Sequence, residues 1–306
     1  MQFTRRGARV CYDSVTFWSA EMELPPRRLE SVGRSARPIG SVVMSVLRLI
    51  QFTDPHLFGD EAGTLRGVAT YPTLVRAIER ARERDWPVDA VLVTGDLVHD
   101  DASGYASFRR ALSGLGKPVY CLPGNHDVAD AMRRELGRAP FVLGGAVDLG
   151  GWRIVLLDST IPGRAGGRLS HAVLAELDAA LASAPGQHAL VCLHHHPVPA
   201  SSRWLDRVGL ANSDEFFRVV DAHRNVRAVL WGHVHQCFDG LRQHVRLLGT
   251  PSTCTQFLPG SDEFATDPRP PAYRTLELLP DGTLRTEVVW VDEASSRCSH
   301  SVCSAA

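Results

Sequence analysis

Short apolar runs alternate with amphipathic stretches along most of this chain, beginning near residue 46. Within residues 71–84, apolar side chains recur every three or four positions and arginines occupy the opposite face. This period predicts a helix with one buried face. Similar patterns predict helices over residues 105–115, 172–181 and 213–222. Ser170 and Ser213 lie near the starts of the last two helices, so we expect them to be N-caps.

The apolar runs are too short for helices and are typical of buried strands. Five of the predicted strands are residues 46–52, 90–93, 119–122, 188–193 and 226–231. Other segments also carry strand signals: two strands around a glycine turn within residues 142–158, and hairpins within 238–248 and 273–291. We therefore predict an α/β fold in which two packed mixed β-sheets are flanked by helices.

The periodic pattern predicts one domain over residues 44–292. Residues 1–43 are rich in arginine and proline and lack both this pattern and the apolar core of a secretory signal. We interpret them as a mis-assigned start, with Met44 as the true first residue, or as a disordered arm. Residues 293–306 are small and polar, so we expect a disordered tail.

Composition limits the possible partners of the chain. Its 306 residues carry a formal net charge of −1, which argues against nucleic-acid binding because that function usually needs an excess of basic residues. No apolar run approaches the roughly 18–20 residues that span a bilayer. The seven cysteines are odd in number and form no C-x-x-C pair, so a reducing cytoplasm is the expected compartment. The oligomeric state is not indicated.

Polar residues able to bind metals occur in five short blocks, each directly after an apolar run. The blocks are Asp54-Pro55-His56, Gly95-Asp96, Gly124-Asn125-His126-Asp127, His194-His195-His196-Pro197 and Gly232-His233-Val234-His235. Loops that follow strands at one edge of an open α/β sheet gather in one crevice. We therefore expect all five blocks to meet. Their carboxylate and imidazole groups suit Fe, Mn or Zn better than Mg or Ca.

This set of side chains fits a two-metal site that hydrolyses phosphate esters. Two metals about 3.5–4 Å apart neutralise the phosphoryl oxygens and generate hydroxide near neutral pH. Asp96 is the expected bridging ligand. Asp54 and His56 alternate on an extended segment, so both can face one metal. His233 and His235 have the same spacing, whereas Asn125 is expected to supply a neutral carbonyl ligand.

His126 follows Asn125 and is expected to point away from the metals, where it would protonate the leaving oxygen as a general acid. Asp127 is available to orient or charge its ring. The histidines outside the blocks are expected to be solvated, or satisfied by ordinary hydrogen bonds. They are His99, His171, His188, His223, His244 and His300.

In this order, the blocks resemble the signature of the calcineurin-like metallophosphoesterases, D-x-H, G-D, G-N-H-D/E, H-H and G-H-x-H, over residues 45–291. The residues that flank the blocks match a smaller group of proteins within this family. Residues 50–58, 193–199, 202–206 and 250–257 resemble the bacterial class III 3′,5′-cyclic-AMP phosphodiesterases.

The resemblance implies two divalent or trivalent metal ions, iron together with iron, manganese or zinc. It assigns the first metal to Asp54, His56, Asp96 and His235. It assigns the second metal to Asp96, Asn125, His194 and His233. Among the consecutive histidines, His194 matches the first histidine of the family's shorter motif, and His195 is the fallback. The substrate would contact His56, Asp96, Asn125, His126 and His235.

The expected activity is hydrolysis of 3′,5′-cyclic AMP to 5′-AMP in the cytoplasm. A metal-bridging hydroxide held at Asp96 would attack phosphorus in line with the 3′ oxygen, and His126 would assist its departure. One alternative is a related phosphodiesterase acting on 2′,3′-cyclic nucleotides or glycerophosphodiesters. The other is a non-catalytic scaffold of the same fold, which we would expect to have lost ligands.

Residues 250–257 are expected to bind the base of the substrate, because the metal site contacts only the phosphate. Gln256 and Phe257 offer an amide and an aromatic ring that could hydrogen-bond and stack a purine. Alternatively, this stretch is only a turn fixed by Pro251.

Overall fold

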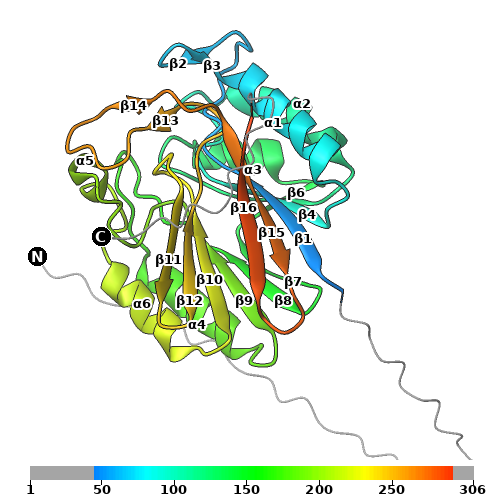
Figure 1. Ribbon diagram of the computed structural model, residues 1–306, viewed down its shortest axis with the longest axis vertical. Helices are drawn as coiled ribbons and strands as arrows, with labels where there is room; N and C mark the ends of the chain where they lie inside the picture. Colours follow the sequence, from blue (N-terminus) through cyan, green and yellow to red (C-terminus); the bar gives the residue numbers. More distant parts are fainter. Residues whose placement is uncertain (1–44, 292–306) are drawn as a thin grey trace, which may run out of the picture. The chain divides into compact units, whose positions relative to one another are not determined.

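The computed structural model describes residues 45–291, which form two six-stranded sheets with helices outside them (Figure 1). The first sheet has the strand order β16-β15-β1-β4-β5-β6, and its strands β1, β4, β5 and β6 are parallel. Its strands are β1 (Leu47–Phe52), β4 (Ala90–Thr94), β5 (Val119–Leu122), β6 (Phe141–Leu143), β15 (Ala272–Leu278) and β16 (Leu284–Trp290).

The second sheet has the order β11-β12-β10-β9-β8-β7, with parallel strands at its centre and antiparallel strands at both edges. Its strands are β7 (Gly145–Leu149), β8 (Trp152–Leu156), β9 (His188–Cys192), β10 (Val226–Trp231), β11 (Phe238–Arg242) and β12 (Val245–Gly249). Both sheets are mixed, as predicted.

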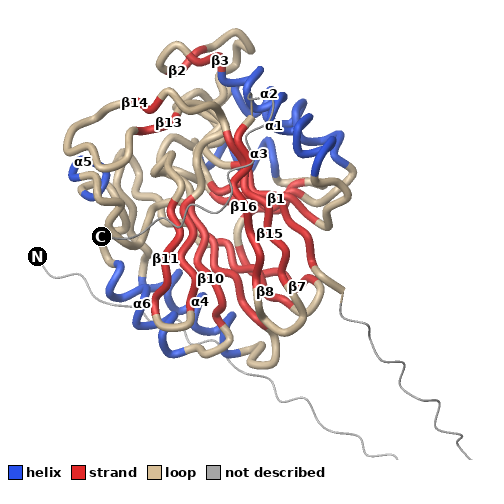
Figure 2. The backbone as a smooth tube through the Cα atoms, in the orientation of Figure 1, coloured by secondary structure: helices blue, strands red, loops and turns tan. Residues whose placement is uncertain are grey.

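Helices cover the outer faces of the two sheets, and Figure 2 shows them in blue on either side of the red strands. The first sheet carries α1 (Thr70–Arg84), α2 (Gly104–Leu112) and α3 (Ala129–Leu136). The second sheet carries α4 (His171–Ala182) and α6 (Ser213–Ala222). The predicted arrangement of two packed sheets flanked by helices is confirmed.

The central strands are apolar throughout because both of their faces are covered. Leu92 and Leu190 pack between the two sheets, whereas their neighbours Val91 and Val191 pack under the helices. Successive side chains of a strand point to opposite faces, and both faces of these strands are covered. Such strands therefore have a continuous apolar sequence rather than an alternating one.

Short elements border the loops that follow the central strands. They are the 3₁₀ turn η1 (Ser113–Leu115), the helix α5 (Arg203–Asp206), and the strand pairs β2 (Thr64–Leu65) with β3 (Val68–Ala69) and β13 (Gln256–Phe257) with β14 (Thr266–Asp267). None of these short strand pairs was predicted, and neither was α3.

Three local predictions differ from the structure. Residues 142–158 contribute to three strands instead of two, and β6 belongs to the first sheet while β7 and β8 belong to the second. The helix at 105–115 ends at Leu112 and continues as η1. Ser213 is the first helical residue rather than the cap, and the side chain of the preceding Asn212 instead bonds both backbone polar groups of Leu169.

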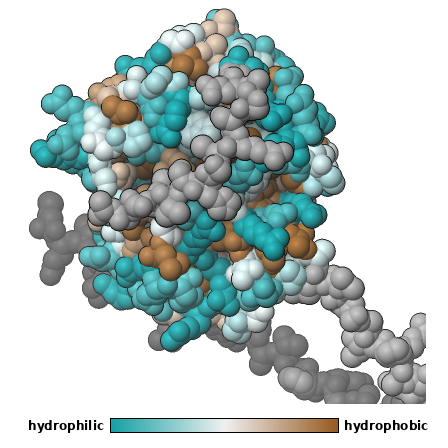
Figure 3. All heavy atoms as spheres, in the orientation of Figure 1, coloured by the Kyte–Doolittle hydropathy of each residue, from teal (hydrophilic) through white to brown (hydrophobic). Residues whose placement is uncertain are grey.

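Ser170 is the N-cap of α4, as expected, and its side chain accepts a hydrogen bond from the backbone N–H of Val173. On the face shown in Figure 3, polar residues predominate and apolar ones are scattered. Among residues 45–291, no helix is long and apolar enough to cross a membrane. The interpretations of residues 1–43 and 293–306 lie outside the described residues.

Candidate metal centre

The predicted ligands meet in the loops that follow β1, β4, β5, β9 and β10. Because the two sheets face each other, the carboxyl ends of β1, β4 and β5 lie opposite those of β9 and β10. Six of these side chains are almost completely buried. They are Asp54, His56, Asp96, His194, His233 and His235.

The backbone takes an unusual conformation at five of these positions. Asp54, His56, Asp96, His233 and His235 all have positive φ angles, between 48° and 66°. This left-handed conformation is uncommon for residues other than glycine and costs on the order of 1–2 kcal/mol per residue. It recurs at functional sites, where the surrounding structure holds it in place. Here it turns each side chain back toward the centre.

Glycine is required at two places where the strand loops come together. A Cβ atom at Gly95, whose φ is 98°, would overlap the ring of His194, and one at Gly124 would overlap the carboxylate of Asp96. The pairs Gly95-Asp96 and Gly124-Asn125 thus follow from close packing. Gly124 lets the loops of the neighbouring strands β4 and β5 approach each other, and Gly95 does the same for loops of the two facing sheets.

One group of ligands is formed by Asp54, His56 and His235. The Nε2 atoms of His56 and His235 are 3.2 Å apart, and Nε2 of His235 is 3.3 Å from Oδ1 of Asp54. Nε2 of His56 is also 3.6 Å from Oδ2 of Asp96. Two imidazoles and two carboxylates therefore converge on one point.

A second group is formed around His194. Its Nε2 is 3.3 Å from Oδ2 of Asp96 and 3.2 Å from Nδ1 of His233. Asp96 therefore reaches both groups, as a bridging ligand must. Within the described residues, Oδ1 of Asn125 is buried and has no hydrogen-bond partner. A buried acceptor without a partner is costly, and a metal ion within reach of this oxygen would satisfy it.

His194 is better placed than His195 to act as a ligand, although ring nitrogens of both lie within 4.8 Å of one on His233. Nδ1 of His194 donates to the carbonyl of Thr94 at 2.8 Å, which leaves Nε2 free to act as a ligand. Both ring nitrogens of His195 face other partners, with Nδ1 2.8 Å from Oγ of Ser159 and Nε2 3.2 Å from the carbonyl of Ala165.

The electrostatics of the centre favour a cation. Burial lowers the pKa values of His56 and His233, so both are neutral and able to act as ligands. Burial opposes charge at His194 too, yet the carboxylates of Asp96 and Asp54 raise its pKa to about 9. In turn, and against its own burial, the pKa of Asp96 is lowered by His194.

His126 lies at the edge of this centre, with about a third of its side chain exposed. Its backbone N–H donates to Oδ1 of Asp96 at 2.9 Å. Its Nδ1 is 3.0 Å from Oδ2 of Asp100, and the backbone N–H of Asp100 donates to the carbonyl of His126 at 3.1 Å. Asp100 is thus the carboxylate that orients this ring.

The expectation that Asp127 orients His126 is wrong. Its carboxylate accepts hydrogen bonds from the backbone N–H groups of Gly124 and Leu97 and from the hydroxyl of Tyr105. These bonds join the loops after β4 and β5, and they turn the carboxylate away from the His126 ring. Asp127 supports the loops that carry Asp96 and Asn125.

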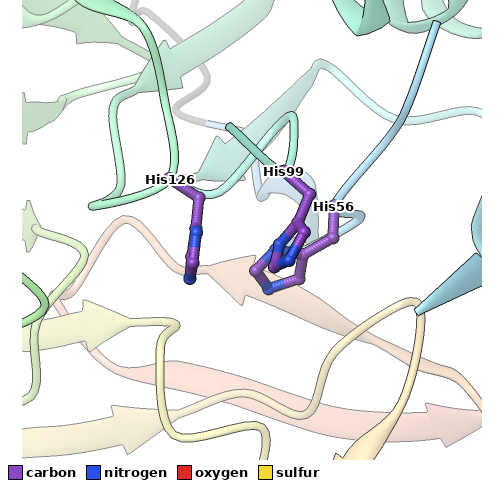
Figure 4. A group of neighbouring side chains, drawn as sticks. All are labelled: His56, His99 and His126. Atoms are coloured by element: carbon purple, nitrogen blue, oxygen red, sulfur yellow. The ribbon is translucent and has the colours of Figure 1, made fainter. Parts of the chain in front are cut away.

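His99 was expected to be an ordinary solvated or satisfied histidine, but it lies beside the candidate metal ligands. Figure 4 shows its ring next to that of His56, with His126 on the adjacent loop. Nδ1 of His99 is 3.1 Å from Nδ1 of His56, and the rings of His99 and His126 are stacked with centroids 4.4 Å apart. Apart from the position of His99 three residues after Asp96, nothing in the sequence indicated this contact.

Residues 250–257 border the centre, but Gln256 is not available to a base. Gln256 is completely buried, and its side-chain amide bonds the backbone of Ser252 and Pro270. Phe257 stacks on the metal-ligand candidate His235, with ring centroids 4.1 Å apart and planes 10° apart. The expected amide contact to a purine is therefore wrong, because the amide holds this segment together.

Beyond Phe257 the aromatic contacts continue toward solvent. The ring of Phe264 is 5.5 Å from that of Phe257 and 5.2 Å from that of Trp204. Phe264 is 44% exposed, and the guanidinium of Arg66 lies 4.8 Å above its ring. A half-exposed aromatic surface therefore begins next to His235.

Solved structures of the same fold differ widely in what their names describe. A dimetal phosphatase from Danio rerio matches with a TM-score of 0.56 and 15% identity, over 81% of this chain and 99% of that one. GAP50, the anchor in the inner membrane complex of Plasmodium, matches with a TM-score of 0.60 and 11% identity, over 83% and 88% of the two chains. At these identities the likeness shows the fold alone.

Two relatives identified by sequence similarity have names that agree on one activity. The protein named 3′,5′-cyclic adenosine monophosphate phosphodiesterase CpdA from Pseudomonas aeruginosa is 41% identical over 246 residues, which cover 80% of this chain and 90% of that protein. Its namesake from Escherichia coli K12 is 41% identical over 79% of this chain and 89% of its own length. The family model described as calcineurin-like phosphoesterase matches residues 47–237. The chain belongs to the calcineurin-like phosphoesterase family.

Proposed function

We propose that the protein hydrolyses 3′,5′-cyclic AMP to 5′-AMP with the help of two metal ions. The observation that carries this proposal is that the carboxylate of Asp96 reaches both ligand groups and that His126 lies at their edge. The relatives that share about two fifths of the sequence over most of the chain bear the name of this activity. The alternative of a non-catalytic scaffold loses support because every ligand position is filled.

The first metal would be held by Asp54, His56, Asp96 and His235. The second would be held by Asp96, Asn125, His194 and His233. Mixed carboxylate and imidazole donors suit iron, with iron, manganese or zinc as the second ion. When bound, such a pair supplies positive charge for the phosphoryl oxygens and a water of lowered pKa.

His126 is proposed to act as the general acid. Asp100 engages its Nδ1, so Nε2 is the nitrogen left to donate a proton. As the bond between phosphorus and the 3′ oxygen breaks, that oxygen would take the proton from His126 and leave as a hydroxyl. His56, Asp96, Asn125 and His235 are the other residues proposed to border the bound phosphate.

The compartment proposed for this reaction is the cytoplasm. Within residues 45–291, Cys121, Cys192 and Cys254 are buried free thiols, as is usual in a reducing compartment.

A substrate panel tests the proposal. The purified protein is freed of metal, reconstituted separately with Fe, Mn and Zn, and assayed against 3′,5′-cyclic AMP and 3′,5′-cyclic GMP. The same panel includes 2′,3′-cyclic AMP and glycerophosphocholine, which represent the alternative diesterase substrates. We expect the highest kcat/KM for 3′,5′-cyclic AMP, with 5′-AMP and not 3′-AMP as the product.

Two results would contradict the proposal. Preference for a 2′,3′-cyclic nucleotide or a glycerophosphodiester would assign the centre to another diesterase reaction. Full metal loading without hydrolysis of any diester would favour the scaffold.

A further inference from the structure

His99 contacts two side chains of the candidate centre at once. It lies in the loop after β4 and is half-buried. Its backbone N–H donates to the carbonyl of Leu57 at 3.0 Å, next to the bridge that pairs Leu57 with Val98. The ring of Phe58 packs edge-on against His99, with centroids 5.5 Å apart. The position of His99 is therefore set by the neighbouring loop that also carries His56.

The contact with His56 is a hydrogen bond between two Nδ1 atoms. Nε2 of His56 faces Asp96 and His235, so a metal ion there would leave the ring proton on Nδ1. Among the residues that the structure describes, the partner of that N–H is Nδ1 of His99 at 3.1 Å, which must then be the acceptor. Histidine ligands in proteins commonly donate their second N–H to such an acceptor, which fixes the orientation of the ring.

The contact with His126 is different in kind. The two rings are stacked, with centroids 4.4 Å apart and planes 29° apart. His126 is about a third exposed, and Asp100, its partner at Nδ1, is 70% exposed. An exposed hydrogen bond restrains a ring only weakly, because water competes for it. The stack with His99 adds a second restraint on the face of the His126 ring.

We propose that His99 is a positioning residue that orients His56 through its Nδ1 acceptor and His126 through its ring face. The part concerning His126 rests on the proposed function, whereas the part concerning His56 rests only on the metal centre. Neither contact requires His99 to touch substrate. The two roles use different parts of one side chain, so they can be separated by substitution.

Two variants separate them. His99→Asn keeps an acceptor oxygen near the position of Nδ1 and removes the ring. His99→Phe keeps a ring for stacking and removes the acceptor. The matched control is His223→Asn, because His223 also makes a hydrogen bond through its ring, to the carboxylate of Asp178 at 2.7 Å, but lies at the end of α6.

The readouts are metal affinity, measured by titration of the metal-free protein with Mn²⁺, and kcat at saturating metal. We expect His99→Phe to weaken binding of one metal equivalent by about 10–100-fold. We expect His99→Asn to bind Mn²⁺ within about threefold of wild type and to lower kcat for cyclic AMP by about tenfold. With bis(p-nitrophenyl) phosphate, the loss of kcat in His99→Asn should be much smaller, because nitrophenolate leaves without a proton.

Equal losses of affinity and kcat in the two variants would overturn the proposal, because they would mean that His99 only fills space. Wild-type behaviour of both variants would overturn it as well. If the wild-type protein hydrolysed the aryl diester but not cyclic AMP, the proposed function would fail. The metal titration would still decide the role of His99 toward His56.

Discussion

Asp96 is the residue on which both ligand groups depend, since its Oδ2 lies 3.6 Å from His56 and 3.3 Å from His194. We predict that Asp96→Ala abolishes turnover and the loading of two metals, because it removes the carboxylate proposed to bridge the two groups. Metal content after dialysis and hydrolysis of cyclic AMP are the measurements. His223→Asn, remote from the centre, serves as the control.

His126 should behave differently from Asp96. We predict that His126→Ala retains both metals and lowers kcat for cyclic AMP by about 10²–10⁴-fold, the usual contribution of a general acid. The loss should shrink for an aryl diester with a good leaving group. If the His126 variant lost its metals while the Asp96 variant kept them, the assignment of roles would be reversed.

The raised pKa of His194 predicts how metal affinity changes with pH. The ordinary value is 6.5 and the value here is about 9. In the metal-free protein, protonation of His194 is therefore stabilising below pH 6.5, and this stabilisation is lost as the pH rises through about 9. Because a metal must displace that proton, we predict that its affinity rises about tenfold per pH unit between these values.

Mn²⁺ titrations at several pH values, in buffers of different ionisation enthalpy, check both the affinity and the proton released. An affinity that stayed flat over this range would show that no proton is displaced. His194→Gln binds metal more weakly, and its affinity should lack the same pH slope.

At the scale of residues, the ligands were predictable because each follows an apolar run that becomes a strand. The contacts around His126 could not be predicted from the sequence. Asp127 is adjacent in sequence, yet its carboxylate is engaged by the backbone of another loop. Asp100 and His99 reach His126 from the loop after β4. Sequence proximity says little about which way a side chain points when the chain turns sharply.

At the scale of elements, the candidate contact for the base of the substrate is the segment from β13 to β14 and not the amide of Gln256. We predict that Phe264→Ala raises KM for cyclic AMP by about 5–30-fold, the range expected for loss of one stacking contact worth about 1–2 kcal/mol. The aromatic surface that it shares with Phe257 and Trp204 begins beside His235.

A ribofuranoside 3′,5′-cyclic phosphate without a base is the control substrate, and its KM should change by less than about twofold. The control variant is Leu241→Ala, which removes another exposed apolar side chain, 72% exposed, on β11. Equal effects of Phe264→Ala on both substrates would mean that the segment supports the metal centre instead of the base.

Helices and central strands were predictable from their periods, because a buried face imposes a repeat on the sequence. The pairing of the strands was harder to predict. Residues 141–156 contain three neighbouring strands, but β6 pairs with β5 and β8 pairs with β9. The pairing of β6 and β8 depends on contacts between distant segments, which local patterns do not encode. The short strand pairs carry too few residues to show any period.

At the scale of the whole molecule, the two ligand groups join the two sheets. The loops after β1 and β4 supply Asp54, His56 and Asp96, whereas those after β9 and β10 supply His194, His233 and His235. We predict that metal removal lowers the melting temperature. A ligand at 100 times its Kd stabilises the folded state by about 2.7 kcal/mol, which corresponds to roughly 5–10 °C for a domain of this size.

Thermal unfolding with and without a chelator measures the effect, and Asp96→Ala serves as the matched control because it should already melt at the lower temperature. An unchanged melting temperature in the wild-type protein would show that the metals do not tie the sheets together.

The separation of the ligands along the chain also has a consequence for biosynthesis. His56 and His235 are 179 residues apart in sequence, yet their Nε2 atoms lie 3.2 Å from each other. Until the ribosome has completed β10, the nascent chain holds Asp54, His56 and Asp96 without His233 and His235, which follow that strand. Metal capture must therefore come after synthesis of most of the domain, and the packing of the two sheets has to organise the site before an ion can add to its stability.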